Sequence, residues 1–292
     1  MEQLAQLVIS GLATGSIYAL AAMGFTLLWQ ASGTINFAQG EFVMLPAFII
    51  LAGMEWFGLP LYASFGLALL ISSLLLGLAF KRMLVDPMIR HGVLPLIIAT
   101  IALGIFLSEG VKTFYSAEAQ PFPDLLPEGL LRVGGVVISY HDIGVMAVAL
   151  VLIIALQLFL SRTMTGRAMQ ATAQNPETAR VLGVNIERMI LYTFVINAVL
   201  VTVAAILVTP VYLAKFDNGA SLGLIAFIAA IVGGFNQMRG ALLGGLLIGV
   251  INNLTVAYLS AAYRDAIPLI LLIVVILFKP EGLLGRREER TV

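Results

Sequence analysis

A short polar segment, SGTINFAQGEF at residues 32–42, interrupts a chain that is strongly apolar on both sides of it. It holds Asn36, Gln39 and Glu41 together with two glycines, Gly33 and Gly40. Amide and carboxylate groups at a break between helices can bond the freed backbone, water or a polar solute crossing a membrane. The segment has no Lys or Arg to anchor it at lipid headgroups, so we predict that it borders a translocation path rather than forming a polar cytoplasmic turn. Both a hairpin tip and a mid-membrane break are compatible with the sequence, and Glu41 could be structural or line the path.

Three further amides lie deep in apolar stretches and are candidates for the same role. Asn197 stands alone in residues 189–213, and Asn252 and Asn253 end the glycine-rich stretch 231–253. Such amides either bond across helices or line a polar path. Most of the glycines in 231–253 follow a small-xxx-small spacing, which predicts a close helix-packing seam. The candidate pathway residues are therefore Asn36, Gln39, Glu41, Asn197, Asn252 and Asn253.

The sequence offers no residues for catalysis or nucleotide binding. There is no cysteine, and the two histidines, His91 and His141, fall at the ends of predicted spans. The patterns G-x-x-x-x-G-K-[ST] and H-E-x-x-H are both absent. We therefore expect no enzyme, no metal site, no cofactor bound by this chain and no nucleic-acid partner.

The composition places these polar groups in a membrane. Sixty per cent of the residues are hydrophobic, 11% are charged and the mean hydropathy is +1.03, whereas soluble domains have about 25% charged residues. Runs such as 61–80 and 143–160 can cross a hydrocarbon core of about 30 Å as helices, and they lack the alternation of barrel strands. We predict an all-α polytopic membrane protein with eight to nine spans and interrupted helices, forming a single transmembrane permease domain over 1–292. The candidate spans are 5–28, 38–57, 61–80, 93–112, 142–160, 189–213, 221–236, 240–260 and 266–279.

The basic residues predict the orientation of the chain. Arginine and lysine gather in the loops 161–188 and 81–91 and after residue 278, while loops of the opposite parity hold few of them. The positive-inside rule makes the basic set cytoplasmic. The amino terminus is then periplasmic and the carboxy terminus cytoplasmic. The opening MEQLAQLVIS lacks the basic region of a cleaved signal peptide.

The longest predicted periplasmic segment is 113–141. It contains the acidic, proline-interrupted AEAQPFPDLLPEG, followed by LLRVGGVVISY, two β-prone runs around a Gly-Gly turn. This pattern predicts a small hairpin. We favour a folded loop that covers helix ends over a cap that touches an external partner.

The loop 161–188 contains the clearest helix signals outside the spans. Asn175 is a good N-cap, Pro176 suits the first helical position, and the acid Glu177 suits the first turn. Gly183 is a natural stop. These residues predict a helix over 176–182.

A helix this short is marginal in water, so it must pack against something. Ala179, Val181 and Leu182 offer the apolar contact. We predict that the loop docks on a cytoplasmic partner; the alternative is an amphipathic loop resting on its own membrane face. The candidate coupling residues are Arg167, Asn175, Pro176, Glu177, Ala179, Arg180, Leu182 and Gly183.

Several stretches resemble one known family. GLATGSIYALAAMGFTLLWQASGTINFAQGEFVMLPAF (11–48) resembles the amino-terminal signature of Liv-type branched-chain amino acid ABC transporter permeases. TGRAMQATAQNPETARVLGVNIERM (165–189) resembles their coupling loop, and GLIAFIAAIVGGFNQMRGALLGGLLIGVINN (223–253) their late glycine-rich segment. The closing LFKPEGLLGRR (277–287) is also similar, while 113–141 matches least well.

The resemblance implies a permease subunit of an ATP-driven importer in a bacterial inner membrane. It implies four kinds of partner: a second related permease, two cytoplasmic ATPase subunits that use the ATP, a periplasmic solute-binding protein, and the lipid bilayer. Delivery by the binding protein and alternating access would move a branched-chain amino acid or a related small solute. It further implies that 165–183 contacts an ATPase and that INFAQGE lies near the path.

Other functions stay open on the sequence alone. The same family includes permeases for urea, short amides and aromatic acids. An ion-coupled secondary transporter or channel is a further alternative, for which Glu41 and Glu109 are the only acids that we consider. A purely structural subunit would leave the polar breaks without a role.

Overall fold

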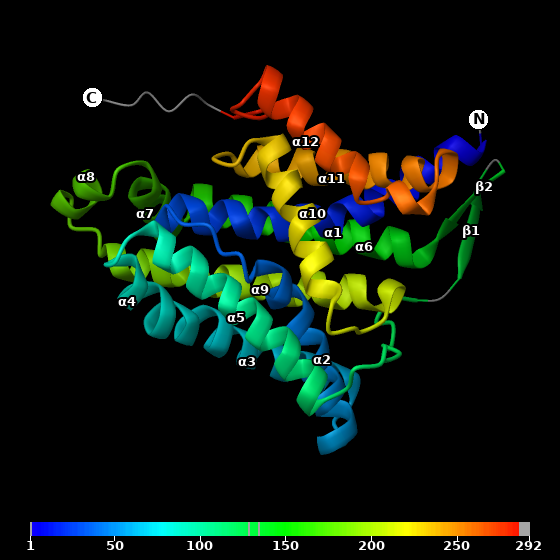
Figure 1. Ribbon diagram of the computed structural model, residues 1–292, viewed down its shortest axis with the longest axis horizontal. Coiled ribbons are helices and arrows are strands. Elements are labelled where there is room, and N and C mark those ends of the chain that lie inside the picture. Colours follow the sequence, from blue (N-terminus) through cyan, green and yellow to red (C-terminus); the bar gives the residue numbers. More distant parts are fainter. Residues whose placement is uncertain (1, 128, 134, 286–292) are drawn as a thin grey trace. The chain divides into compact units, whose positions relative to one another are not determined.

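The computed structural model of this chain describes residues 2–127, 129–133 and 135–285, and most of them are helical (Figure 1). The helices are α1 (Glu2–Ser32), α2 (Gln39–Phe57), α3 (Leu61–Ser72), the π-helical η1 (Ser73–Val85), α4 (Asp86–Ile89), α5 (Val93–Phe114), α6 (Tyr140–Arg162), α7 (Met164–Gln174), α8 (Pro176–Val181), α9 (Ile186–Tyr212), α10 (Asn218–Gly233), α11 (Met238–Tyr258), the short 3-10 turn η2 (Ala261–Tyr263) and α12 (Ala266–Phe278).

The predicted all-α membrane fold is confirmed. Within the described residues, eight helices are long and apolar enough to cross a membrane, and α10, with 16 residues, is a shorter apolar helix. These numbers agree with the expected eight to nine spans. The basic tail residues Arg286, Arg287 and Arg290, which contributed to the orientation argument, lie outside the described residues.

One predicted boundary is wrong. The helix that begins at Leu61 runs without a break to Ile89, so Lys81 and Arg82 lie within it rather than in a loop. The ammonium of Lys81 is 2.9 Å from the Asp86 carboxylate, and Lys81 is only 7% exposed. The Asp86 carboxylate compensates the charge of the buried Lys81 ammonium. This basic residue can therefore lie inside the helix.

The chain divides into two compact units. The first comprises 1–26, 126–150 and 224–292, and the second comprises 27–125 and 151–223. The helices α1, α6 and α10 each pass from one unit to the other along their length.

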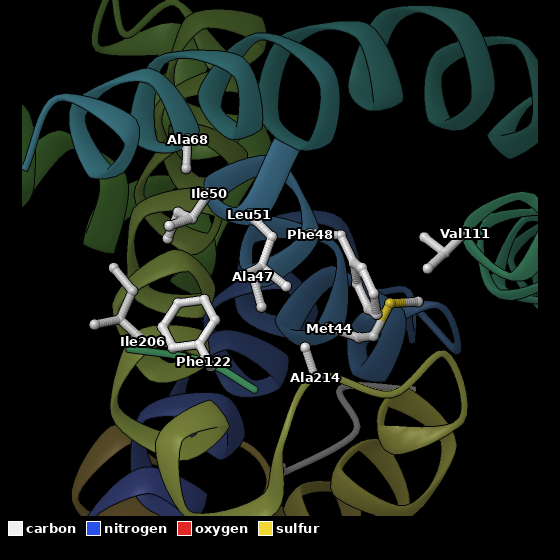
Figure 2. Packing of buried hydrophobic residues seen from close by; sticks show 10 residues of the cluster. All are labelled: Met44, Ala47, Phe48, Ile50, Leu51, Ala68, Val111, Phe122, Ile206 and Ala214. Carbon is white, nitrogen blue, oxygen red and sulfur yellow. The ribbon is translucent and has the colours of Figure 1, made fainter. Parts of the chain in front are cut away.

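The core of the second unit is built around α2. Figure 2 shows Met44 and Phe48 of α2 close together, and Phe122 beside Ile206 of α9. Phe122 comes from the loop after α5 and is 8% exposed. The backbone of Gln120 also pairs with that of Ala214 in both directions at 2.9 Å. The first part of the predicted outer loop therefore folds onto the helices of its own unit.

In the first unit, α1 and α11 pack at a seam of small residues. Gly11, Gly15 and Ala19 recur every four residues on α1, opposite Gly245 and Gly249 of α11. A Cβ added at Gly15 would lie 2.8 Å from the Cα of Leu246, so the helices approach too closely for larger side chains. The predicted packing role of the late glycines is confirmed at these positions.

The predicted hairpin is also present. Strands β1 (Leu130–Val133) and β2 (Val136–Ser139) pair antiparallel, with Leu130 opposite Ser139 (Figure 1). Gly135, in the turn, has φ +85°, a conformation that glycine adopts without a steric penalty. The side of the membrane on which the hairpin lies stays a prediction.

Candidate functional site

The polar break, defined here as Gly33–Ala38, separates α1 from α2 in the second unit. Gly33 has φ +64°, and its N–H donates to the carbonyl of Trp29 at 2.8 Å, which ends α1. The side-chain Oδ1 of Asn36 accepts a hydrogen bond from the backbone N–H of Ala38 at 3.0 Å. The Asn36 amide therefore satisfies a backbone donor that the break leaves without a helical partner.

A closed cluster of amides joins the break to α9. Gln39 Nε2 donates to Asn197 Oδ1 at 2.7 Å, and Asn197 Nδ2 donates back to Gln39 Oε1 at 3.0 Å. Asn36 Nδ2 lies 3.4 Å from the same Gln39 oxygen. Gln39 and Asn197 are fully buried and Asn36 is 4% exposed. Three of the predicted pathway residues thus meet, and in this conformation their polar groups bond one another across helices.

The polar break lies beside the middle of two long neighbouring helices, α9 and α5. Asn197 is the twelfth of 27 residues in α9, and Gly104, which borders Glu41, is the twelfth of 22 in α5. At 1.5 Å per residue, both positions lie roughly 16 Å from the start of their helices. This places the break at mid-helix depth and favours the interrupted-helix alternative over a hairpin tip.

Two helix amino termini meet at this depth. Gly40 of α2 packs directly against Gly219 and Gly223 of α10, and a Cβ on Gly40 would lie 2.9 Å from the Cα of Gly223. A Cβ on Gly219 would lie 2.9 Å from the backbone of Glu41. Each helix amino terminus carries a partial positive charge. Glu41 lies in the first turn of α2 and is therefore close to this partial positive charge.

The loop left between the predicted spans 189–213 and 221–236 is present as an irregular segment, residues 213–217, which leads back to this depth. After α9 ends at Tyr212, the carbonyl of Leu213 accepts a hydrogen bond from Asn218 Nδ2 at 2.6 Å. The Ser108 hydroxyl donates to the carbonyl of Phe216 at 3.2 Å. Protein groups therefore satisfy these two carbonyls of the irregular segment. The Asn218-Gly219 pair was the available signal for this turn.

A small cavity adjoins the break. Its volume is about 10 Å³, roughly that needed by a single water molecule. Its walls combine apolar side chains with the polar residues Thr34, Asn36 and Thr100. Thr100 of α5 also accepts a hydrogen bond from the backbone N–H of Phe37 at 3.3 Å. Thr100 therefore joins the break, although nothing in the local sequence marked it.

The remaining pathway candidates belong to the first unit. Asn252 is 1% exposed, and its Nδ2 donates to the hydroxyl of Tyr18 in α1 at 3.4 Å. Its Oδ1 has no hydrogen-bond partner among the described residues. Asn253 is half-buried on the same helix. Asn252 thus bonds across helices, and the pathway role of both residues stays a prediction.

The predicted coupling helix forms as α8, with its expected caps. Asn175 Oδ1 accepts a hydrogen bond from the backbone N–H of Thr178 at 2.9 Å, Pro176 and Glu177 occupy the first turn, and Gly183 follows with φ +84°. The sequence did not predict α7, which precedes it and is capped by Thr163 through a 2.9 Å bond from Gly166 N–H.

The apolar residues of α8 do not share one environment. Ala179 is 2% exposed, so it packs within its own chain and is not available to a partner, contrary to our expectation. Val181 and Leu182 are 87% and 76% exposed. Arg167 and Arg180 are exposed as well. The outward apolar surface is therefore the tip formed by Val181 and Leu182.

Sequence comparison identifies the family of this chain. A family model described as the permease component of branched-chain amino acid transport systems matches residues 7–276. The chain belongs to this family. It is a multi-pass membrane permease component, which agrees with the eight long apolar helices found among the described residues.

Relatives within this permease family cover nearly the whole chain. BraD of Pseudomonas aeruginosa, a high-affinity branched-chain amino acid transport system permease protein, is 35% identical over 98% of this chain and 97% of its own length. LivH of Escherichia coli, named in the same way, is 33% identical over the same shares. Among solved structures, a chain of PsaBC from Streptococcus pneumoniae in complex with Fab matches with a TM-score of 0.52 at 10% identity, covering 93% of this chain and 91% of that one, and it supports the fold alone.

Proposed function

We propose that this chain is the permease subunit of an ATP-driven importer of branched-chain amino acids or a related small solute in a bacterial inner membrane. Its partners are a second related permease, two cytoplasmic ATPase subunits and a periplasmic binding protein that delivers the solute. The names of its relatives at 33% and 35% identity support the solute class. This chain binds no cofactor, and the partner subunits use the ATP.

One observation carries the link to a separate motor. The segment α7–α8 forms a capped helical unit between α6 and α9, and its tip exposes Val181 and Leu182. Two large apolar side chains at the end of a six-residue helix gain stability when a partner covers them. A cleft on an ATPase subunit is the partner that this proposal assigns to them.

The polar break supplies the element that changes conformation. In the closed arrangement its amides bond one another, and two helix ends meet through glycine contacts. Alternating access requires these contacts to separate, so that the same amides and backbone groups can bond water or solute. Selectivity then rests with the binding protein, and the permease needs only a weak, polar passage.

The exposed tip formed by Val181 and Leu182 provides the test of the proposed contact with an ATPase subunit. Val181→Glu and Leu182→Glu place a charge on the exposed apolar tip and leave the caps intact. We expect each to lower stimulated ATP hydrolysis and leucine uptake at least tenfold, in liposomes that hold the chain with its copurified partners. Val181→Ala and Leu182→Met are the matched controls and should stay within about threefold of wild type. Ala179→Glu is unsuitable, because it would disturb the fold itself.

Two outcomes would count against the proposal. Full stimulation in both glutamate variants would remove the tip from coupling. Solute flux at full rate through liposomes holding only this chain, without nucleotide, would instead favour an ion-coupled transporter or a channel.

A further inference from the structure

The segment after α12, residues 279–285, has a structural role that could not be predicted from its sequence. It runs along the carboxyl end of α10 within the first unit, although 45 residues separate Gly233 from Lys279 along the chain. We call it the tail segment.

The tail segment completes the hydrogen bonds of α10. The last four carbonyls of any α-helix lack partners inside the helix. In α10, those of Ala230 and Ile231 accept from the N–H of Gly234 at 3.0 and 3.1 Å. Those of Val232 and Gly233 accept from two tail N–H groups, Leu283 at 2.8 Å and Leu284 at 2.9 Å.

The approach is close enough to require glycine on both sides. A Cβ on Gly282, where φ is +80°, would lie 2.6 Å from the Cα and the N of Gly234. A Cβ on Gly234, where φ is +119°, would lie 2.8 Å from the Cα of Gly285. A hydrogen bond within the tail segment also stabilises it, because Lys279 Nζ donates to the carbonyl of Leu283 at 2.7 Å. Its side chains contribute less: Leu283 and Leu284 are 39% and 43% exposed.

The other end of α10 carries the glycine contacts of the polar break. Gly219 and Gly223 in its first two turns are the residues that pack against Gly40. α10 is one continuous helix of 16 residues, roughly 24 Å long, so the tail contacts and the glycine contacts lie at its opposite ends.

We propose that the tail segment is a positioning element for α10: its backbone holds the carboxyl end of the helix whose amino end packs on the polar break. The consequence for transport rests on the proposed function, whereas the effect on α10 itself does not.

The test separates backbone from side chain at one residue. Leu283→Pro removes the N–H that bonds Val232, and Leu283→Ala keeps it. Each is combined with Ser221→Cys, which introduces an exposed reporter thiol in the first turn of α10, in a chain that has no cysteine of its own. We expect maleimide labelling of this thiol in membranes to change at least threefold in the proline variant and less than 1.5-fold in the alanine variant.

Transport gives the second readout. A substitution that only lowers the fraction of folded protein reduces ATP hydrolysis and solute uptake equally. The ratio of ATP hydrolysed to solute transported then stays constant. Misplacement of α10 should raise that ratio at least threefold in Leu283→Pro and not in Leu283→Ala. Equal labelling and equal ratios in the proline variant and wild type would overturn the proposal.

Gly282→Ala keeps the test decisive if the proline variant does not insert, because the added Cβ crowds Gly234 and leaves every N–H in place. It should change labelling in the same way. Failure of both variants to insert, with Leu283→Ala normal, would show a purely structural tail and overturn the proposal. If wild type shows no ATP-driven uptake, the proposed function fails, while the labelling result still decides the role of the tail.

Discussion

The molecule satisfies two interruptions of its helices in different ways. The polar break between α1 and α2 is held by side chains, because Asn36, Gln39 and Asn197 supply the partners. The turn between α10 and α11, residues 234–237, is held by backbone, because Leu283 and Leu284 donate to α10. Each break contains a glycine at positive φ, Gly33 in the first and Gly234 in the second.

The two glycines differ in their surroundings, which shows what each break requires. Apart from Gly33 and its chain neighbours, no atom of the described residues lies within 4 Å of the place where a Cβ would be added at Gly33, whereas Gly234 is in contact with the tail segment. The first break therefore has spare room and depends on particular amides. The second depends on close backbone approach, which requires glycine at Gly234 and Gly282. Under the proposed function the first break opens during transport, and amides that can exchange partners suit that role.

The largest effect is expected at the crowded glycine. Gly234→Val adds a branched side chain at φ +119°, where its Cβ would meet the backbone of Gly285 at 2.5 and 2.8 Å. Strain and overpacking together should cost about 3 kcal/mol or more. Thermal unfolding followed by size-exclusion of the extracted protein would measure the loss. A variant as stable as wild type would show that the contact with the tail is loose.

A smaller effect is expected from the amide cluster. Gln39→Leu or Asn197→Leu leaves a buried amide without its partner and should cost about 1–2 kcal/mol. The double variant removes both groups, so its loss should fall at least about 1 kcal/mol short of the sum. The four proteins form a double-mutant cycle read by thermal unfolding. Strict additivity would contradict a direct bond between the two side chains.

The smallest effect is expected at the open glycine. Gly33→Ala meets no atoms and bears only the penalty of a left-handed conformation, about 1 kcal/mol. Gly33→Asn is the matched control, because asparagine adopts this conformation more readily, and it should lie closer to wild type. The same thermal measurement applies. A loss at Gly33→Ala as large as at Gly234→Val would erase the difference between the breaks.

Features encoded by neighbouring residues could be predicted from the sequence. The caps of α8 follow from Asn175, Pro176 and Gly183, all within nine residues. The α1–α11 seam follows in part from glycine spacing. The presence of the polar break also follows, since amides and an acid are costly in lipid and mark an exception to the apolar pattern.

The missing parts depend on distant partners. Gln39 and Asn197 are 158 positions apart, and nothing in either local pattern names the other. Lys81 is a different case, because its partner Asp86 is only five positions away, and charged residues so close together indicated a loop. The contact of the tail segment with α10 could not be predicted for another reason. It is made by the backbone N–H groups of Leu283 and Leu284, and almost every residue has such a group.

The irregular stretch between α9 and α10 has a consequence for biogenesis. Its polar backbone is bonded by Gln120, Ser108 and its own Asn218, and the following glycines pack on α2. Ribosomes make α2 and α5 first, so the surface that accepts residues 213–223 exists before they leave the translocon. A gene rearranged to synthesise this stretch ahead of α2 would deliver it to bare lipid, where its unbonded amides would resist insertion.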